Sequence, residues 1–321
     1  MTMNVPPPDP GSVAALVEVT AAEAAGDQVL GEVRAGGPPI DMRAERRQAR
    51  RERRRLLLRR PGFVVGTLIL LFWVFCAIAG DRVTPYHPIN EYGPPSEGPN
   101  SSHLMGTDQL GRDVLSRVMA GARDVLIAAP TAAILGVAAG TLLGLLMGYY
   151  RGWLDELFSR IIEALLSIPV ILVALLITAS LGSSRTVVIV TVAVLFTPIV
   201  TRTVRAAVMS ESQLDYVTSA RLRGESGLFV MTREIAPNIT AAIVVELTVR
   251  VGYAVFTIAT LSFLGAGIQP PAPDWGLSLK DSYSLIPAGQ WWGTLFPALA
   301  IASLVIATNL VADSIEAVLA S

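Results

Sequence analysis

Long runs without charged residues dominate the hydropathy pattern of this chain. Four runs contain no Asp, Glu, Lys or Arg, and they cover residues 61–80, 125–150, 164–184 and 282–312. A helix needs about 20 apolar residues to cross the hydrocarbon core of a bilayer, so each run is long enough to span a membrane. The pattern predicts an all-α polytopic membrane protein.

Six membrane-spanning helices are expected once the remaining apolar stretches are included. They lie at about Phe63–Gly80, Val125–Tyr149, Ile162–Leu181, Thr186–Val204, Ile239–Leu264 and Thr294–Ile315. The stretch between the last two, Gly265–Gly293, is rich in Pro, Gly and Trp and is predicted to be a loop. One membrane domain at residues 61–321 accounts for these elements.

The charge balance adds two segments before the first span. Only 16% of the 321 residues are charged and the net charge is −1, whereas soluble domains carry about 25% charged residues. Residues 1–42 are acidic and Pro-rich, which predicts a disordered cytoplasmic tail. Residues 43–60 hold ten arginines. Because this segment ends where the first span begins, a membrane-proximal flank that contacts lipid is favoured over a site for nucleic acid.

The distribution of Lys and Arg predicts the orientation in the membrane. With the N-terminus inside, the segments on the cytoplasmic side hold most of these residues, including the arginine segment, Arg205 and Arg221. Cytoplasmic loops of membrane proteins carry such an excess. We therefore expect both termini in the cytoplasm.

Rare residue types exclude several kinds of site. The only lysine, Lys280, is followed by Asp281, so a nucleotide-binding loop that ends in Gly-Lys-Ser/Thr is excluded. A single cysteine, Cys76, and two histidines supply neither an intrachain disulfide nor a conventional zinc site. We predict no catalytic, cofactor-binding or metal-binding residue here, and if ATP drives the protein another chain must bind it.

Small residues and prolines mark the expected helices. Gly136, Gly140, Gly144 and Gly148 recur every four residues, so they line one helix face and let another backbone approach closely. The partner helix would belong to the same chain or to a second subunit. Prolines inside or beside the spans indicate bending or gating; they are Pro130, Pro169, Pro198 and Pro297.

Two opposite charges interrupt the fifth expected span. Glu246 and Arg250 are spaced i,i+4 with the acid first, the favourable order on a helix. Charges near mid-bilayer cost roughly 2.5–3.5 kcal/mol each on insertion scales, so they need a partner or water. We hypothesise that the pair lines a translocation path. The alternatives are that the two charges neutralise each other, or that Arg250 reaches the cytoplasmic surface.

A polar segment at about residues 205–238 is the first feature that indicates a specific function. Tyr216–Arg223 has helical character, Gly224 interrupts it, and Leu228–Ile235 resumes before Pro237. A charged helix–turn–helix at the cytoplasmic face suits the docking of a partner, and an amphipathic interfacial loop is the alternative.

Four stretches of sequence resemble the dipeptide/oligopeptide/nickel permeases of ABC importers. The segment Tyr216-Val-Thr-Ser-Ala-Arg-Leu-Arg-Gly224, with Pro237 thirteen residues later, resembles their EAA coupling loop. The other three are His103–Asp113, Gly148–Asp155 and Leu261–Gly276. The resemblance covers about residues 55–321 and fits the second, C-type permease.

This resemblance implies a type I importer fold and a set of partners. These would be a homologous B-type permease, two cytoplasmic ATPases that bind ATP and Mg, and an extracytoplasmic binding protein. The substrates of the family are peptides and related small solutes. The residues that match its coupling motif are Tyr216, Ala220, Gly224, Ile235 and Pro237.

The chain also departs from the family pattern. Thr218 and Ser219 stand at the usual Glu-Ala positions and Ala236 at a usual leucine, so a contact from the EAA glutamate is not expected. The arginine segment is unusual, and it would bind anionic lipid or contact the ATPases. The rival functions are a secondary transporter that uses Glu246 or Asp313 and a membrane scaffold without transport activity.

Overall fold

The computed structural model describes residues 56–319. The acidic tail expected at residues 1–42 and most of the arginine segment expected at 43–60 lie outside the described residues. Within the described part, the regular elements are helices, and one isolated bridge joins Thr107 to Asp113. The prediction of an all-α polytopic protein is confirmed at this level.

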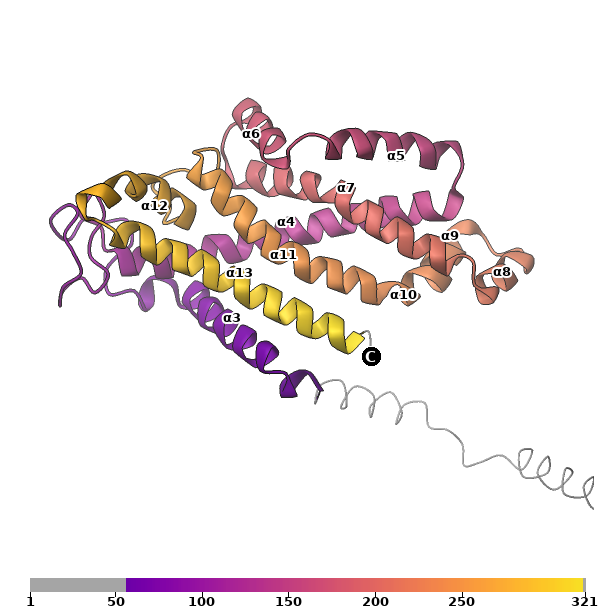
Figure 1. Cartoon of the computed structure of the whole chain (residues 1–321), viewed down its shortest axis with the longest axis horizontal. Helices are drawn as coiled ribbons and strands as arrows, with labels where there is room; N and C mark the ends of the chain where they lie inside the picture. The colour runs from indigo at the N-terminus through magenta and orange to yellow at the C-terminus, as the bar shows by residue number, and fades with distance from the viewer. Residues whose placement is uncertain (1–55, 320–321) are drawn as a thin grey trace, which may run out of the picture. The chain divides into compact units, whose positions relative to one another are not determined.

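Among residues 56–319, five helices are long and apolar enough to cross a membrane (Figure 1). They are α3 (Pro61–Ala79), α4 (Val114–Tyr150), α7 (Arg185–Glu211), α11 (Thr240–Phe263) and α13 (Trp292–Leu319). Three of them are clearly longer than the expected spans: α4 begins well before Val125, α7 continues past Val204, and α13 continues past Ile315. The start of α4 is fixed by Asp113, whose carboxylate accepts a hydrogen bond from the backbone N–H of Ser116, as an N-cap does.

The third expected span is broken into two helices. Helix α5 (Trp153–Leu166) and helix α6 (Val170–Leu181) meet at an angle of 88°. Pro169 is the N-cap residue of α6; proline lacks a backbone N–H and disfavours helical geometry in the residue before it. The third expected span, Ile162–Leu181, is thus bent next to Pro169, as the proline indicated, and residues 56–319 contain five candidate spans, or six if the bent pair is one span.

The glycines of α4 lie against α7. A Cβ added to Gly140 would lie 2.6 Å from Cβ of Val200, and one added to Gly144 or Gly148 would lie 2.8 Å from Cβ of Val204 or Val208. The absence of side chains is what allows the two backbones to pack this closely. The helix that meets the ridge thus belongs to the same chain.

A tryptophan joins the predicted loop Gly265–Gly293 to the helices. Trp275 is 1% exposed, packs edge-on against Trp73 with ring centroids 4.8 Å apart, and donates a hydrogen bond from Nε1 to the Val118 carbonyl at 2.8 Å. It begins helix α12 (Trp275–Ser282), which a 3₁₀ turn at Tyr283–Ala288 follows. The expectation of an irregular loop here is wrong for this part, because Asp274 caps a helix.

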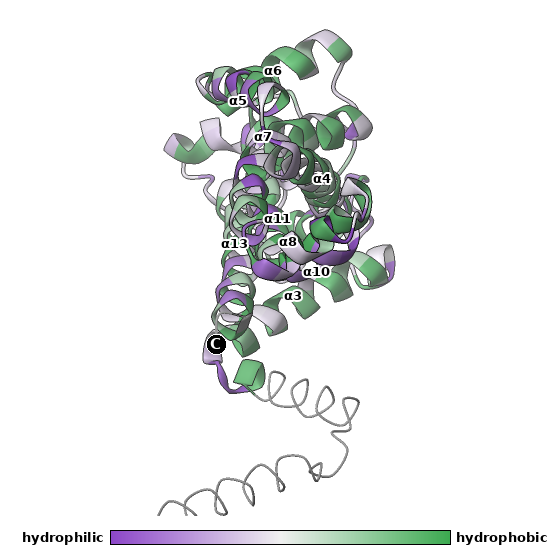
Figure 2. Ribbon diagram, turned by 90° about the vertical axis from the view of Figure 1, so that its right-hand side faces the viewer, coloured by the Kyte–Doolittle hydropathy of each residue, from purple (hydrophilic) through white to green (hydrophobic). Residues whose placement is uncertain are grey.

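Hydropathy follows this arrangement. In Figure 2 the long helices are mostly green, and purple residues gather on α5, α8 and the connections between helices. Apolar side chains on the outside of the helices are typical of a protein whose solvent is lipid.

Candidate functional site

Four short helical elements connect α7 to α11. They are α8 (Asp215–Leu222), α9 (Gly227–Phe229), the π-helical turn η2 (Val230–Ile235) and α10 (Ala236–Asn238). We call residues 215–238 the coupling segment. The helix expected at Tyr216–Arg223 corresponds to α8, and the segment expected from residue 205 begins later because α7 continues to Glu211.

One side of the coupling segment is buried against the long helices. Val217, Ala220, Val230 and Ile235 are each 0% exposed and belong to one apolar cluster. Val204 and Val208 of α7, the residues that contact the glycine ridge, belong to the same cluster. The structure therefore brings two predicted features together, and Ala220 and Ile235 hold the segment in place.

Tyr216 ties both ends of the coupling segment to α7. Its hydroxyl donates a hydrogen bond to the carboxylate of Glu211 and accepts one from Nδ2 of Asn238 at 2.9 Å. Partial burial, reinforced by the bond to Glu211, raises the pKa of Tyr216 to about 12. The phenol is thus a neutral donor at ordinary pH.

The opposite side of the segment is exposed around a sharp turn. Gly224 has φ +80°, and an added Cβ would have no atom within 4 Å. The left-handed backbone conformation, and not a lack of space, therefore favours glycine here. Leu222 is 84% exposed and Leu228 is 67% exposed; Pro237 is exposed as well. Motif matching missed both leucines, although their position on either side of Gly224 could have indicated them.

Glu246 and Arg250 form an ion pair on α11. Nε of Arg250 lies 2.9 Å from Oε2 of Glu246, and each side chain is 12% exposed. The guanidinium carbon also lies 5.3 Å from the centroid of the Tyr253 ring and 5.8 Å from that of Phe196, within the range of cation–π attraction. Both charges are therefore held by partners on α11 and α7.

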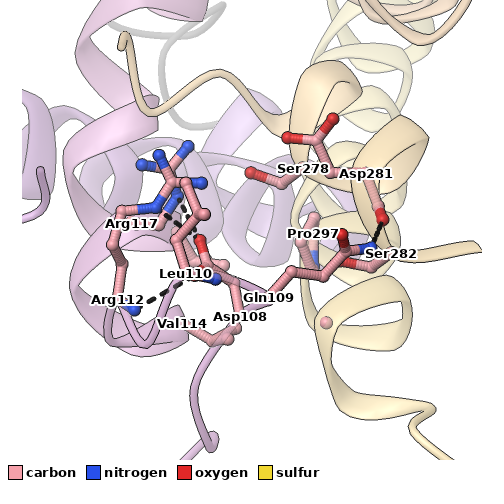
Figure 3. A pocket seen from close by; sticks show the side chains of 12 residues that line it. Asp108, Gln109, Leu110, Arg112, Val114, Arg117, Ser278, Asp281, Ser282 and Pro297 are labelled. Atoms are coloured by element: carbon pink, nitrogen blue, oxygen red, sulfur yellow. Dashed lines mark hydrogen bonds and ion pairs between the residues drawn. The ribbon is translucent and has the colours of Figure 1, made fainter. Parts of the chain in front are cut away.

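A polar cavity lies where the loop before α4 meets α12 and the start of α13. Its volume is about 240 Å³. In Figure 3, Asp108, Arg112 and Arg117 stand on one wall, and Ser278 and Asp281 stand on the other. We call it the loop cavity.

The charges on the first wall satisfy one another. Asp108 accepts a hydrogen bond from Nε of Arg112 at 2.7 Å and lies 3.6 Å from Nε of Arg117. Arg117 also donates to the backbone carbonyls of Pro88 at 3.1 Å and Ala272 at 3.4 Å. These contacts anchor the loop to α4 and to the chain before α12.

The stretch His103–Asp113 forms part of the same loop. Nδ1 of His103 and Oδ1 of Asp113 are 2.9 Å apart, and both side chains are buried. The second carboxylate oxygen of Asp113 accepts from the Ser116 hydroxyl at 2.7 Å. The stretch that carries part of the family resemblance thus builds the start of α4.

Within residues 56–319, the structure contains no group of three or more His, Cys, Asp or Glu side chains that could hold a metal ion. The features that stand out are instead the exposed side of the coupling segment, the buried ion pair on α11 and the loop cavity. Together with the apolar helices, they define the chain as a multi-pass membrane protein in which a structured segment connects α7 to α11.

Comparison with known proteins identifies its family. Residues 140–321 match the family described as "Binding-protein-dependent transport system inner membrane component". The chain is 38% identical over 268 residues to the glutathione transport system permease protein of Pectobacterium atrosepticum, which covers 83% of this chain and 89% of the relative. It is 37% identical over 262 residues to the di/tripeptide transport system permease protein of Pseudomonas aeruginosa, covering 79% and 86%.

A dipeptide transport system permease protein of Haemophilus influenzae is 36% identical over 262 residues, covering 79% of this chain and 88% of the relative. The chain belongs to the inner membrane components of binding-protein-dependent transport systems. It is accordingly a multi-pass permease of the bacterial inner membrane, and the resemblance inferred from its motifs is confirmed.

Proposed function

We propose that this chain is the C-type permease subunit of an ABC importer for peptides or related small solutes such as glutathione. It forms half of the translocation path beside a homologous B-type permease. Two cytoplasmic ATPases bind ATP and Mg and carry out hydrolysis, and an extracytoplasmic binding protein delivers the substrate. The names of the relatives support the substrate class.

The coupling segment is the observation that carries this proposal. Its buried side is fixed to α7 and its free side exposes Leu222 and Leu228 beside the Gly224 turn. Large exposed apolar side chains at a membrane protein's polar end are typical of contact with another protein. ATPase closure then acts on this segment and, through the buried cluster, on α7.

Six spans with both termini in the cytoplasm complete the proposal. In this topology the bent pair of α5 and α6 returns the chain across the membrane, so that α7 brings the coupling segment to the cytoplasmic side. The excess of Lys and Arg on that side supports the orientation.

A bulky side chain at Gly224 tests the docking role. Gly152 offers a matched control, because it also has a positive φ, +82°, and also has nothing within 4 Å of an added Cβ. We expect Gly224→Trp to uncouple ATP hydrolysis from import in the purified complex while the subunits still assemble, and Gly152→Trp to leave the two coupled. Substrate uptake and ATPase rates in proteoliposomes measure the effect. A wild-type chain that never co-purifies with an ATPase would refute the importer itself.

Glu246 and Arg250 remain our candidates for the wall of the path. Because removing one charge would leave the other buried without its partner, the informative variant is the double substitution Glu246→Gln with Arg250→Gln. If the pair lines the path, import of charged peptides should fall by about tenfold, the scale of one polar contact, with assembly unchanged. Equal uptake rates in the double variant and the wild type would reduce the pair to a structural role.

A further inference from the structure

A second polar cavity opens between α5 and α7, with α4 behind it. Its volume is about 380 Å³, within the range of small-molecule pockets, roughly 300–1,000 Å³. Its polar lining consists of Ser159, Glu163, Thr201, Arg202 and Arg205. We call it the α5–α7 cavity.

The two arginines of the cavity differ in how their charge is used. Arg205 donates two hydrogen bonds to Asp155 of α5, at 2.5 Å from Nε and 2.7 Å from Nη2. Arg202, which lies three residues earlier and on the same face of α7, has no carboxylate within ion-pair distance among residues 56–319 and is exposed. One cationic side chain in the cavity is thus without an anion.

The acidic wall is provided by α5. Asp155, Ser159 and Glu163 follow one another every four residues, so they share one face of this helix. Asp155 is committed to Arg205, whereas Glu163 pairs loosely with Arg160 at 3.6 Å, and their side chains are 67% and 74% exposed. An exposed ion pair of this kind is worth little, so Glu163 is free to meet another cation.

The contrast with Arg250 indicates which charge can take a ligand. Arg250 is held by Glu246 and by two aromatic rings, and its side chain is largely buried. Arg202 lies about one and a half turns along α7 from Phe196, one of those rings. The charge of Arg202 is therefore the more accessible of the two.

We propose that the α5–α7 cavity binds a small zwitterion, with a carboxylate at Arg202 and an ammonium group at Glu163. This proposal rests on the proposed function, because the cavity would be a binding site for the solute during import. It favours solutes that carry both a carboxylate and an ammonium group. A phospholipid headgroup is the other source of an anion near the cytoplasmic end of α7. The acid in the wall disfavours a headgroup with a net negative charge, such as that of phosphatidylglycerol, since Glu163 would repel it.

Cysteine labelling tests binding independently of transport. Ser159→Cys places a thiol in the cavity, and Ser180→Cys on exposed α6 is the control outside it. The chain is purified with its partner subunits, reconstituted in phosphatidylcholine vesicles and treated with a maleimide, and mass spectrometry of this chain reads the labelling. Cys76 is 2% exposed and gives a low background.

The probe is alanyl-alanine, compared with alanyl-alanine amide, which lacks the carboxylate. We expect the free dipeptide to slow labelling at residue 159 but not at residue 180, and the amide to protect much less. In the Arg202→Gln background, the half-protecting concentration should rise about tenfold, the effect of losing one charge-assisted hydrogen bond. The control is Arg160→Gln, which removes an exposed arginine of α5 and should not raise the half-protecting concentration.

Three results would overturn the proposal. They are labelling that ignores the dipeptide, protection that is equal for dipeptide and amide, and protection that survives Arg202→Gln. Labelling slowed only when phosphatidylglycerol is added to the vesicles would assign the cavity to lipid instead. If any of these occurs while the ATPases still co-purify and drive import, the importer function stands and the zwitterion site alone fails.

Discussion

Asp274 shows how a single side chain can make the fold sensitive to pH. It is 1% exposed, its Oδ1 accepts the Leu277 N–H at 2.8 Å, and its Oδ2 has no hydrogen-bond partner. Burial raises the pKa of Asp274 to about 6 from the ordinary 3.8. The carboxyl therefore holds its proton in the folded chain at pH values where the unfolded chain has lost it.

The sign of the effect on stability follows. A carboxyl whose pKa is raised on folding makes the folded state less stable as pH rises from about 4 to about 6, and the cost then stays constant. Asp274→Asn keeps an oxygen for the Leu277 N–H and removes the charge. We expect it to remove a pH-dependent loss on the order of 1–3 kcal/mol, measured by thermal unfolding in detergent between pH 4 and 7. Identical pH profiles for variant and wild type would contradict this.

At the scale of elements, one ion pair links α5 to α7. Asp155 binds Arg205 of α7 through two hydrogen bonds, and the outer face of α5 exposes Leu157, Ile161 and Leu165. Glu156, the next residue, is exposed and has no ion-pair partner among the described residues. Both carboxylates lie in the first turn of α5, but only Asp155 forms an ion pair. Substituting each in turn therefore distinguishes the effect of the ion pair from that of a negative charge at the helix start.

We expect Asp155→Asn to raise backbone hydrogen exchange across α5 by about tenfold, because one charge-assisted pair no longer opposes local opening. Glu156→Gln should leave it unchanged, and exchange in α4 should not respond to either substitution. Hydrogen exchange with mass spectrometry in nanodiscs measures this. Equal protection of α5 in the two variants would show that other contacts hold the helix.

The sequence predicted the positions of the helices better than it predicted which helices contact one another. Uncharged runs located the long helices, and the spacing of the glycines located a packing face; only the structure showed that this face meets α7, because spacing defines a face and not its neighbour. Pro169 indicated a bend, but the run around it is uncharged throughout, so hydropathy did not show that two separate helices meet there. Asp274 caps α12 in the structure, whereas the Pro and Gly residues nearby led us to expect a loop.

For the site, motif matching located the segment between α7 and α11 but did not indicate which of its residues are exposed. Ala220 and Ile235 match the family motif but are buried, whereas Leu222 and Leu228 carry the free surface. A motif records which positions are constrained, and burial constrains them as strongly as contact does. Whether Arg202 has an ion-pair partner depends on side chains of α4 and α5, which line the same cavity. A local sequence pattern in α7 does not reveal this.

At the scale of the whole molecule, the number of spans depends on whether α5 and α6 together cross the membrane. Glu156 lies before the 88° bend and Ser183 lies after α6. In the six-span topology, cysteines at these positions lie on opposite sides. In a re-entrant arrangement they lie on the same side.

We expect Glu156→Cys to react with a membrane-impermeant maleimide only in inside-out vesicles, and Ser183→Cys only in right-side-out vesicles. Ser101→Cys, in the loop before α4, marks the extracytoplasmic side in both topologies, whereas Leu222→Cys, in the coupling segment, lies on the side opposite Ser101 only if there are six spans. Reaction of residues 156 and 183 from the same side would reduce the chain to five spans and place its ends on opposite sides.

The glycine contact between α4 and α7 has a mechanical consequence. Because the glycines bring the two helices into close contact from Gly136 to Gly148, we expect α4 and α7 to move together over this stretch. Val208, at the cluster that holds the coupling segment, sits at one end of it. With its 37 residues, α4 is roughly 55 Å long, and a rotation of about 10° at that end would displace the other by roughly 10 Å. Leverage, rather than a chain of small local adjustments, would then carry movement from one side of the membrane to the other.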